Sequence, residues 1–457
     1  MRYRPRDWVP APLEAAIASL AGRYGTGDAD SLQHELDTLL DAHERLVDRD
    51  CISLIAGTNI MNPRVARYLS HTVGSRPSLG YPGDKYETGL VHAERIEVMT
   101  TELLKRVFRC AYAEHRVASG SLANLYAYLA TCEPGDTIFA FPSAFAGHVT
   151  HHAAGAAGLY RLRVLDMPMD PACMSIDLDA LREAARRERP RLLIVGGSMC
   201  LYPYPVREVR AIADAFGARV MYDAAHMSGL IAGGEFQQPL AEGAHLMTAS
   251  TYKSFGGPPS GMVLTDDAAL ARRLDAIAYP GLTANFDLGR TAALAAACLD
   301  VLEHGAAYAR QCIDNARALA LALRAEGCPV FAATAGPNSQ RPTDSQFVAV
   351  PVAGLPVASL RPEGPHGFGG TAASRLIERA NILTTGIDVP GEPVAGDQNA
   401  IRIGTQEITR WGFVPADMPR LARLLARVWV AGEPPESLRD EVTAWRREHA
   451  SLRYVRS

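Results

Sequence analysis

The chain of 457 residues is long enough for two or three domains, and with 48% hydrophobic and 21% charged residues it has the composition of a soluble globular protein. Its formal net charge of −4 gives no reason to expect a nucleic acid or an anionic membrane as a partner. The 8 cysteines are scattered without a CxxC pair, and no signal-like leader or apolar run of membrane-spanning length occurs. We therefore expect a cytoplasmic protein with reduced thiols and without a disulfide framework, a zinc site or a membrane span.

Strand-like and helix-like runs alternate along residues 52–264. They follow an N-terminal arm in which apolar residues at helical spacing over 31–49 predict an amphipathic helix. Such alternation is typical of an α/β domain built on a mainly parallel sheet. The predicted strands are 52–57, 137–141, 191–197, 219–222 and 246–250, and the predicted helices are 92–108, 122–131, 178–188 and 206–216.

A smaller α+β unit is predicted in the C-terminal part. We divide the chain into a helical arm (1–50), a large α/β domain (51–285) and a small α+β domain (286–457). An arm of this length outside a core often packs on a partner subunit. In the small domain we predict several Ala/Leu-rich helices within 289–326 and further helices at 418–431 and 436–449. The predicted strands are 347–352 and 400–403, with a loop at 361–370 between them.

Residues 219–261 hold the residue types on which the functional prediction depends. The run 219–222 ends on Asp223, His226 follows, and the run 246–250 leads to Lys253 in a Gly/Pro loop. Because ligands of open α/β sheets bind at the carboxyl ends of the strands, we expect these three side chains at one rim. An amine that forms a Schiff base and an Asp that faces a pyridine nitrogen are what pyridoxal phosphate (PLP) requires.

Composition favours a chemical role for Lys253. Most lysines are surface charges, and an Asp at a strand end often only caps a helix. However, only three of the 46 basic residues here are lysines, so this chain uses Arg wherever a plain positive charge suffices. A guanidinium does not give up its proton and cannot form a Schiff base. Lys253 is therefore unlike the other basic residues.

Ser119, Gly120 and Ser121 open the predicted helix 122–131 and suit a phosphate group. A helix N-terminus offers free backbone N–H groups and the positive end of the helix dipole, and two hydroxyls add donors. The alternative is that Ser only caps the helix. We add Ser250, which ends the run before Lys253, to the expected cofactor-binding residues.

The histidines after the strand 137–141 allow two interpretations. A ring at His148 or Phe145 would lie on a flat cofactor or belong to the core. The cluster of His148, His151 and His152 also suggests a metal, but this spacing without a nearby Cys or paired carboxylate is poor for zinc. We predict no metal site.

Two further segments are candidate substrate contacts. Arg402 lies on a predicted strand, and its fork of donors would clamp a substrate carboxylate, although an inter-domain salt bridge explains it equally well. The Gly/Pro/aromatic loop 80–87 exposes Tyr81, Tyr86 and Glu87, and such loops often carry function; an ordinary surface turn is the alternative.

With these residues placed, the chain resembles serine hydroxymethyltransferase, a fold-type I (aspartate aminotransferase-like) PLP enzyme, from about residue 52 to 430. The resemblance implies a mainly parallel, seven-stranded-type large domain, a smaller α+β C-terminal domain, and a homodimer or homotetramer with active sites shared between subunits. The motifs that carry it are LIAGTN, GYPGDKY, SGSLAN, EPGDT, GHVTHH, YDAAHMSGLIAGG, TYKS and IRIGTQEITRWGF. It implies the Schiff-base lysine at Lys253, the pyridine-nitrogen contact at Asp223, the ring hydroxyl near His226, the stacked ring at His148, the phosphate at Ser119, Gly120 and Ser121, and the substrate carboxylate at Arg402.

Several positions depart from the family's pattern. Leu79 stands where the family has a Glu that takes part in acid–base steps and folate binding, and Pro77 replaces a nearby Tyr. Tetrahydrofolate is therefore a doubtful cofactor, and Leu79 leaves more apolar room for a bulkier or α-methyl substrate. The other replacements are Gly57-Thr58 for Ser-Glu, Glu87 for the second Tyr of a pair, Phe145 and Tyr252 for His, and Pro259 for Arg.

The predicted reaction makes or breaks the Cα–Cβ bond of a β-hydroxy-α-amino acid such as serine, α-methylserine or a threonine-like substrate. The substrate amine displaces Lys253, a base takes the β-hydroxyl proton, the aldehyde leaves, and the carbanion is stabilised through the ring and Asp223. The departures favour a folate-independent aldolase or transaldolase, or an α-methylserine-type hydroxymethyltransferase. Candidate bases are His148, His226 and Glu87. The alternatives are another PLP reaction (transamination or decarboxylation) and a binding or structural protein.

Overall fold

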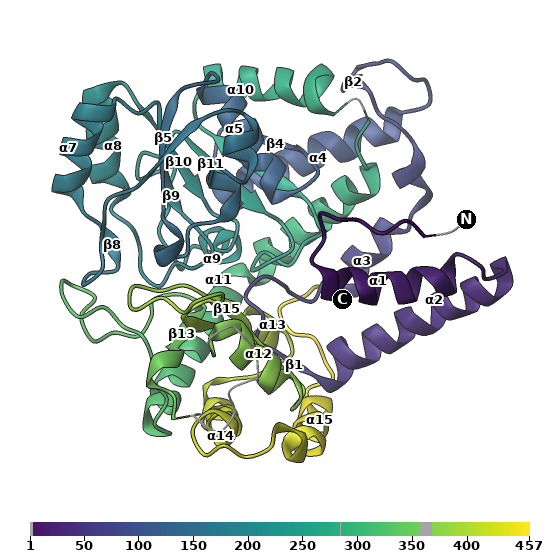
Figure 1. Cartoon of the computed structure of the whole chain (residues 1–457). Coiled ribbons are helices and arrows are strands. Elements are labelled where there is room, and N and C mark those ends of the chain that lie inside the picture. The colour runs from purple at the N-terminus through teal and green to yellow at the C-terminus, as the bar shows by residue number, and fades with distance from the viewer. Residues whose placement is uncertain (1–2, 284, 357–367) are drawn as a thin grey trace.

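A computed structural model describes residues 3–283, 285–356 and 368–457, and a seven-stranded sheet forms the centre of its larger part (Figure 1). The strand order is β4–β12–β11–β10–β9–β5–β6. Neighbouring strands from β11 to β6 are parallel, whereas β12 is antiparallel to both of its neighbours. The bounds are β4 (Tyr112–Val117), β5 (Thr137–Ala140), β6 (Arg163–Asp166), β9 (Leu192–Gly196), β10 (Arg219–Asp223), β11 (Leu246–Ser250) and β12 (Gly261–Thr265).

The predicted α/β class with a mainly parallel sheet is thus confirmed, and the one reversed strand has a simple cause. Between β11 and β12 lie only residues 251–260, which is shorter than the crossover that a parallel pair needs. The loop that carries Lys253 therefore turns the chain back, and β12 runs antiparallel to β11.

Helices cover both faces of the sheet, so its inner strands β5 and β9 to β12 are almost entirely buried, whereas the edge strands β4 and β6 carry charged and partly exposed residues. Every residue of β9 is buried; Leu192 and Ile194 belong to one core cluster and Leu193 and Val195 to the other. One face is covered by α5 (Gly120–Thr131) and α10 (Ala268–Ala276). The helices that contribute to the other cluster include α4 (Val91–Phe108), α7 (Leu178–Glu188), α8 (Val206–Phe216) and α9 (Ser228–Gly233).

The C-terminal part is built on a second, antiparallel sheet of three strands in the order β13–β16–β15. A short strand β1 (Ile52–Ser53) pairs in parallel with β14 (Ile382–Leu383), so Ile52 and Leu54 pack in the C-terminal core. The division into an arm and two domains stays a prediction, and this pairing attaches residues 52–54 to the C-terminal part. The other elements here are β13 (Phe347–Pro351), α12 (Gly370–Glu378), β15 (Thr385–Ile387), β16 (Ala400–Gly404), α13 (Gln406–Arg410), α14 (Met418–Trp429) and α15 (Arg439–Glu448).

Helix α11 (Leu288–Ala325) connects the two parts as one uninterrupted helix of 38 residues, where the sequence analysis predicted several helices. Its N-terminal half contacts α4 and α9, and its C-terminal half contacts α14 and β13 (Figure 1). The Ala/Leu-rich sequence has strong helix propensity and no proline, so nothing in the segment ends the helix early.

The N-terminal arm consists of α1 (Ala11–Tyr24) and α2 (Ala29–Glu44), followed by a π-helical segment η1 (Arg45–Asp50) (Figure 1). No helix in the described ranges is long and apolar enough to cross a membrane. Residues 361–367 of the predicted loop 361–370 lie outside the described residues. The remaining short α-helices and β-strands are α3 (Pro63–Leu69), β2 (Gly80–Tyr81), β3 (Asp84–Lys85), α6 (Ala156–Leu159), β7 (Met169–Asp170) and β8 (Ser175–Ile176).

Candidate active site

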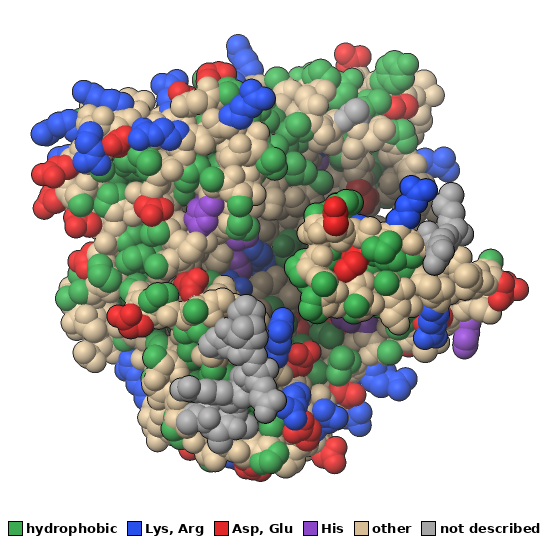
Figure 2. All heavy atoms as spheres, in the orientation of Figure 1, with side chains coloured by type: hydrophobic (Ala, Val, Ile, Leu, Met, Phe, Trp, Pro, Cys, Tyr) green, Lys and Arg blue, Asp and Glu red, His purple; other side chains and the backbone are tan. Residues whose placement is uncertain are grey.

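A cavity of about 70 Å³ lies at the carboxyl ends of the parallel strands, beside the ends of β10 and β11. In Figure 2 the surface is hollowed between the large sheet, the C-terminal part and the N-terminal helices, and histidine and cationic side chains are visible inside this hollow. The cavity lining includes every residue that the sequence analysis assigned to the cofactor. It consists of Ser119, Gly120, Ser121, Asn124, His148, Gly197, Asp223, Ala225, His226, Ser250, Tyr252 and Lys253.

Lys253 is buried, with 7% of its surface exposed, and its Nζ lies 3.0 Å from Nε2 of His226. Burial lowers the pKa of its amine to about 8, and the charge of Arg402 adds to this effect while that of Asp223 opposes it. Roughly a tenth of the amine is therefore unprotonated at pH 7, far more than for an exposed lysine with a pKa near 10.4. Only the unprotonated amine attacks a carbonyl carbon, so the site prepares Lys253 as a nucleophile.

Asp223 is held in its ionised form although it is buried. Burial by itself raises the pKa of the carboxyl, but the hydrogen bond and charge of His151 hold it at about 2. His151 Nε2 lies 2.7 Å from Asp223 Oδ2, and the backbone N–H of Ala225 donates to Oδ1 at 2.9 Å. The other ring nitrogen of His151 contacts the hydroxyl of Tyr128. The cavity thus ends in a fixed negative charge.

His148 forms part of the cavity wall and is tied to Asp223 through two uncharged side chains. Its Nδ1 lies 2.7 Å from Thr150 Oγ1, and Asn124 Nδ2 donates both to Thr150 Oγ1 (2.9 Å) and to Asp223 Oδ2 (3.3 Å). Thr248, on β11, donates to Asn124 Oδ1 at 2.8 Å. Burial lowers the pKa of His148 to about 4, so the ring is neutral near pH 7.

His226 stands between Lys253 and a backbone carbonyl. Its Nδ1 lies 3.2 Å from the carbonyl oxygen of Ala56, and its own carbonyl accepts hydrogen bonds from Gln346 and Ser254. Burial, together with the positive charge of Lys253, lowers the pKa of the ring well below its usual value. Since a carbonyl only accepts, the proton of the neutral ring is on Nδ1, and the lone pair on Nε2 faces the amine of Lys253.

The N-terminus of α5 reaches the same cavity. Ser119 is the N-cap, and its hydroxyl accepts a hydrogen bond from the N–H of Leu122 at 3.2 Å. The cap and a phosphate contact are compatible, because the first N–H groups of a helix have no partner within the helix. At Gly120, a Cβ atom would lie 2.2 Å from Ser250 Oγ, so the absence of a side chain lets the helix end approach β11 closely.

Arg402 extends from β16 towards the large sheet. Its Nη1 donates to the carbonyl oxygen of Ser198 at 2.5 Å, and its Nε donates to Thr385 Oγ1 at 3.3 Å. Burial lowers the pKa of the guanidinium to about 10. Both partners are uncharged, so within the described residues these contacts do not amount to the inter-domain salt bridge that was the alternative.

Comparison with known proteins identifies the family. The family model described as serine hydroxymethyltransferase matches residues 30–425. The chain belongs to this family. It is 48% identical to an alpha-methylserine aldolase of Variovorax paradoxus over 450 residues, which is 98% of each chain, and 45% identical to one of a Ralstonia species over 99% of each. It is 36% identical to a serine hydroxymethyltransferase of Methanopyrus kandleri, over 92% of this chain and 94% of that one.

Membership of the serine hydroxymethyltransferase family confirms the predicted fold-type I PLP architecture and the predicted enzyme class. The protein is a PLP-dependent enzyme of the hydroxymethyltransferase/aldolase kind, which acts on the Cα–Cβ bond of hydroxy amino acids. The residues present fit PLP, because a buried amine, a permanently ionised carboxylate and a helix N-terminus meet in one cavity. Among residues 3–283, 285–356 and 368–457, no group of three or more His, Cys, Asp or Glu side chains is arranged to hold a metal ion.

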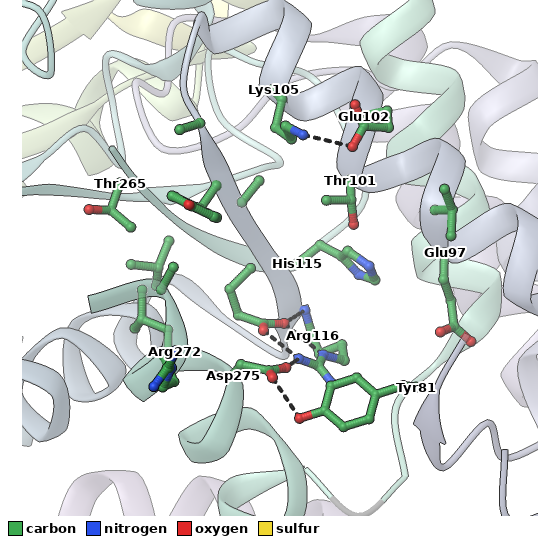
Figure 3. A pocket seen from close by; sticks show the side chains of 18 of the residues that line it. Tyr81, Glu97, Thr101, Glu102, Lys105, His115, Arg116, Thr265, Arg272 and Asp275 are labelled. Atoms are coloured by element: carbon green, nitrogen blue, oxygen red, sulfur yellow. Dashed lines mark hydrogen bonds and ion pairs between the residues drawn. The ribbon is translucent and has the colours of Figure 1, made fainter. Parts of the chain in front are cut away.

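Three predicted substrate contacts lie away from this cavity within one chain. Tyr81 donates to Asp275 Oδ2 at 2.7 Å, in a separate pocket of about 670 Å³ beside β4 and α4 (Figure 3). Tyr86 is 82% exposed, and Glu87 accepts a hydrogen bond from the N–H of Leu79. None of the three lines the cavity that contains Lys253.

Three residues of the site were missed as site residues: His151, Asn124 and Thr150. His151 was considered only as a metal ligand, although it follows His148 by one short turn and therefore lies beside it. Its contact with Asp223 joins residues 72 positions apart, and the contact of Asn124 with Asp223 joins residues 99 apart. Local spacing carries no signal for such pairs.

Proposed function

We propose that this protein is an α-methylserine-type aldolase that releases formaldehyde from its substrate without tetrahydrofolate. The observation that carries the proposal is the 48% identity over 98% of both chains to a protein named alpha-methylserine aldolase, against 36% to one named serine hydroxymethyltransferase. Leu79 and Pro77 support it independently, because they remove the carboxylate and phenol that the family places before its GYPG motif.

The same proposal assigns the cavity residues to PLP. Lys253 would hold the cofactor covalently, and Asp223, ionised above about pH 2, would keep a proton on the pyridine nitrogen. His148 would lie against the ring. When bound, PLP supplies an electron-accepting ring for the carbanion that bond cleavage leaves. The phosphate would be held by Ser119, Gly120, Ser121 and Ser250 at the N-terminus of α5.

Arg402 would bind the substrate carboxylate. Its guanidinium extends to Ser198, which follows the cavity residue Gly197, so the fork is at the cavity's edge. Within the described residues its hydrogen bonds use Nε and Nη1, which leaves Nη2 for an incoming carboxylate.

Of the three candidate bases, we propose His226 as the acceptor of the β-hydroxyl proton. Its Nε2 carries a lone pair towards Lys253, whereas in His148 the N–H of Thr150 donates to Nδ1, so the neutral ring carries its proton on Nε2. Glu87 lies on the loop after β3, outside the cavity of its own chain, so within one chain the choice is between the two histidines.

We also propose a homodimer or homotetramer in which Tyr81, Tyr86 and Glu87 contribute to a neighbouring subunit's site. These residues are predicted to bind substrate, yet they lie outside the cavity of their own chain. The exposed phenol of Tyr86 and the exposed leucines of α2 support contact with a second copy.

The test of the reaction uses purified enzyme with PLP and α-methyl-L-serine, with and without tetrahydrofolate. We expect formaldehyde and alanine in equal amounts at the same rate in both cases. Formaldehyde transfer that requires tetrahydrofolate would overturn the aldolase proposal in favour of hydroxymethyl transfer. CO₂ in place of the aldehyde would instead identify decarboxylation. Because α-methylserine has no Cα proton to lose, transamination is tested with L-serine, from which a keto acid would identify it.

A further inference from the structure

Residues 53–60 form a segment, here called the 53–60 strap, that contacts His226 and the backbone of Lys253. The carbonyl of Ala56 faces Nδ1 of His226 at 3.2 Å, and Asn59 Nδ2 donates to the carbonyl of Lys253 at 2.9 Å. Both contacts go to residues on which the proposed reaction depends. The position of the 53–60 strap therefore sets the tautomer and orientation of His226 and the backbone of Lys253.

The other side of the strap is held by α13, two residues after the strand that carries Arg402. Gln406 Nε2 donates to the carbonyls of Ile55 and Thr58, both at 2.8 Å. Glu407 adds side-chain contacts: its Oε2 accepts hydrogen bonds from Ser53 Oγ (3.0 Å) and Thr58 Oγ1 (2.8 Å). One oxygen of one carboxylate thus joins both ends of the strap.

Glu407 is buried, with 3% of its surface exposed, and its carboxyl gains or loses a proton near neutral pH. Burial raises the pKa of the carboxyl to about 7, against the two hydroxyl hydrogen bonds, which lower it. The charged groups that act on it are Asp48 of η1, which raises the pKa, and Arg446 of α15, which lowers it. Above pH 7 the ionised Oε2 accepts from both hydroxyls. Below pH 7 protonation removes the negative charge that strengthens both hydrogen bonds, so Oε2 binds the two hydroxyls less tightly.

We propose that Glu407 is a positioning residue for the reaction, which in its ionised form holds the 53–60 strap against His226 and Lys253 more firmly than in its protonated form. Glu407 does not line the cavity that contains Lys253; it acts through Ser53 and Thr58. The strap contains Gly57 and Thr58, one of the places where the sequence departs from the family's pattern. The kinetic part of this inference rests on the proposed function.

The main test compares Glu407→Gln with the unchanged holoenzyme between pH 6 and 8. Gln has the shape of protonated Glu at every pH, so we expect the two enzymes to agree at pH 6. At pH 8 the unchanged enzyme should have a kcat/KM for α-methyl-L-serine roughly fivefold higher, the value of one lost hydrogen bond. A ratio that does not change with pH would overturn the proposal, because a purely structural role moves both pH values alike.

A second readout needs no turnover, so it separates this inference from the proposed reaction. The pH titration of the visible absorption of the bound cofactor reports on the surroundings of Lys253. We expect its midpoint to differ between the unchanged holoenzyme and Glu407→Gln, and identical midpoints together with a flat kinetic ratio would contradict the inference. If no amino acid is turned over, this titration alone decides.

Two further variants guard the test. Thr58→Val removes one of the two hydroxyls that donate to Glu407, at nearly constant volume. Because Thr58 is exposed, this variant should fold even if Glu407 variants fold poorly. We expect its kcat/KM to fall below that of the unchanged enzyme at pH 8 but not at pH 6, by less than in Glu407→Gln. A Thr58→Val enzyme with the unchanged profile would count against the strap. Glu448→Gln, an exposed carboxylate on α15, is the matched control and should leave the profile as it is.

Discussion

At the scale of single residues, a chain of hydrogen-bond contacts connects Tyr128 through His151 to the carboxylate of Asp223. Tyr128 contacts His151, His151 contacts Asp223, and Asp223 faces the cavity. A lone buried carboxylate would take up a proton to avoid the cost of desolvation. His151 prevents this, because its hydrogen bond and charge favour the ionised form.

Replacing His151 should therefore weaken the site without emptying it. In His151→Asn the imidazole no longer offsets the effect of burial, so the Asp223 pKa rises and the ionised form becomes less stable; we expect PLP affinity and kcat each to fall roughly tenfold, the equivalent of about 1.4 kcal/mol. Titration of the apoenzyme with PLP and initial rates at pH 7.5 measure both quantities. The exposed His43→Asn on α2 is the control. An unchanged PLP affinity would show that His151 does not act on Asp223.

The effect of His151 on Asp223 should also change how the stability of the fold depends on pH. The folded-state pKa of Asp223, about 2, lies below the unfolded value, so its ionisation stabilises the fold above pH 4 and this contribution is lost as the pH falls towards 2. In His151→Asn less of it remains. The difference in Tm between the two apoenzymes should thus be larger at pH 6 than at pH 3.

How much of the site could be predicted depended on where each residue lies relative to a strand end. Asp223 and Ser250 end parallel neighbours, so sequence pattern alone brought them and Lys253 to one rim. His151, Asn124 and Thr150 act through contacts between distant segments, which no local spacing shows. Tyr81, Tyr86 and Glu87 lie elsewhere in their own chain, and their predicted role needs a second one.

At the scale of elements, the loop that carries Lys253 is fixed by a close approach of α9. The N–H of Gly229 lies 3.0 Å from Ser254 Oγ, and a Cβ on Gly229 would lie 2.2 Å from the carbonyl oxygen of Ser254. Backbone on both sides leaves no flexible side chain to move aside. The spacing between α9 and the Lys253 loop therefore depends on a glycine.

Gly229→Ala should separate these two elements. Alanine has the higher helix propensity, but the clash pushes the Lys253 loop outward, so we expect a loss of about 1–3 kcal/mol in the free energy of unfolding. PLP binding should weaken with it. Denaturant unfolding of the apoenzyme and titration with PLP provide the measurements. Gly22→Ala on α1, where nothing lies within 4 Å of the new Cβ, should be neutral or slightly stabilising.

The bounds of helices and strands were predictable where a single hydrophobic pattern, helical or strand-like, runs through the whole segment. The ranges of α7, α8 and β11 agree with the sequence prediction to the residue, because each is a clean amphipathic or apolar run. Strand β12 and the two-residue β14 were missed, since short strands next to Gly/Pro loops have no distinctive pattern. The join between β1 and β14 spans more than 300 residues and is a product of tertiary packing.

At the scale of the whole molecule, the N-terminal arm has an apolar face with no cover within the described chain. No residue of α2 is buried, and Leu36, Leu39 and Leu40 are 51%, 51% and 61% exposed. Leucines at positions i, i+3 and i+4 form one stripe along a helix. A stripe of this kind on a folded protein favours association with another subunit.

The double variant Leu36→Glu, Leu40→Glu should therefore weaken assembly. Two carboxylates in an apolar contact are costly to desolvate, so we expect a shift towards monomer in analytical ultracentrifugation at micromolar concentration. Because the proposed site takes Tyr81, Tyr86 and Glu87 from a neighbour, kcat/KM should fall with the oligomer fraction and recover at high protein concentration. Leu321→Glu, an exposed leucine on α11, is the control and should remain assembled and active. A double variant that becomes monomeric but stays fully active would show that each chain's site is complete by itself.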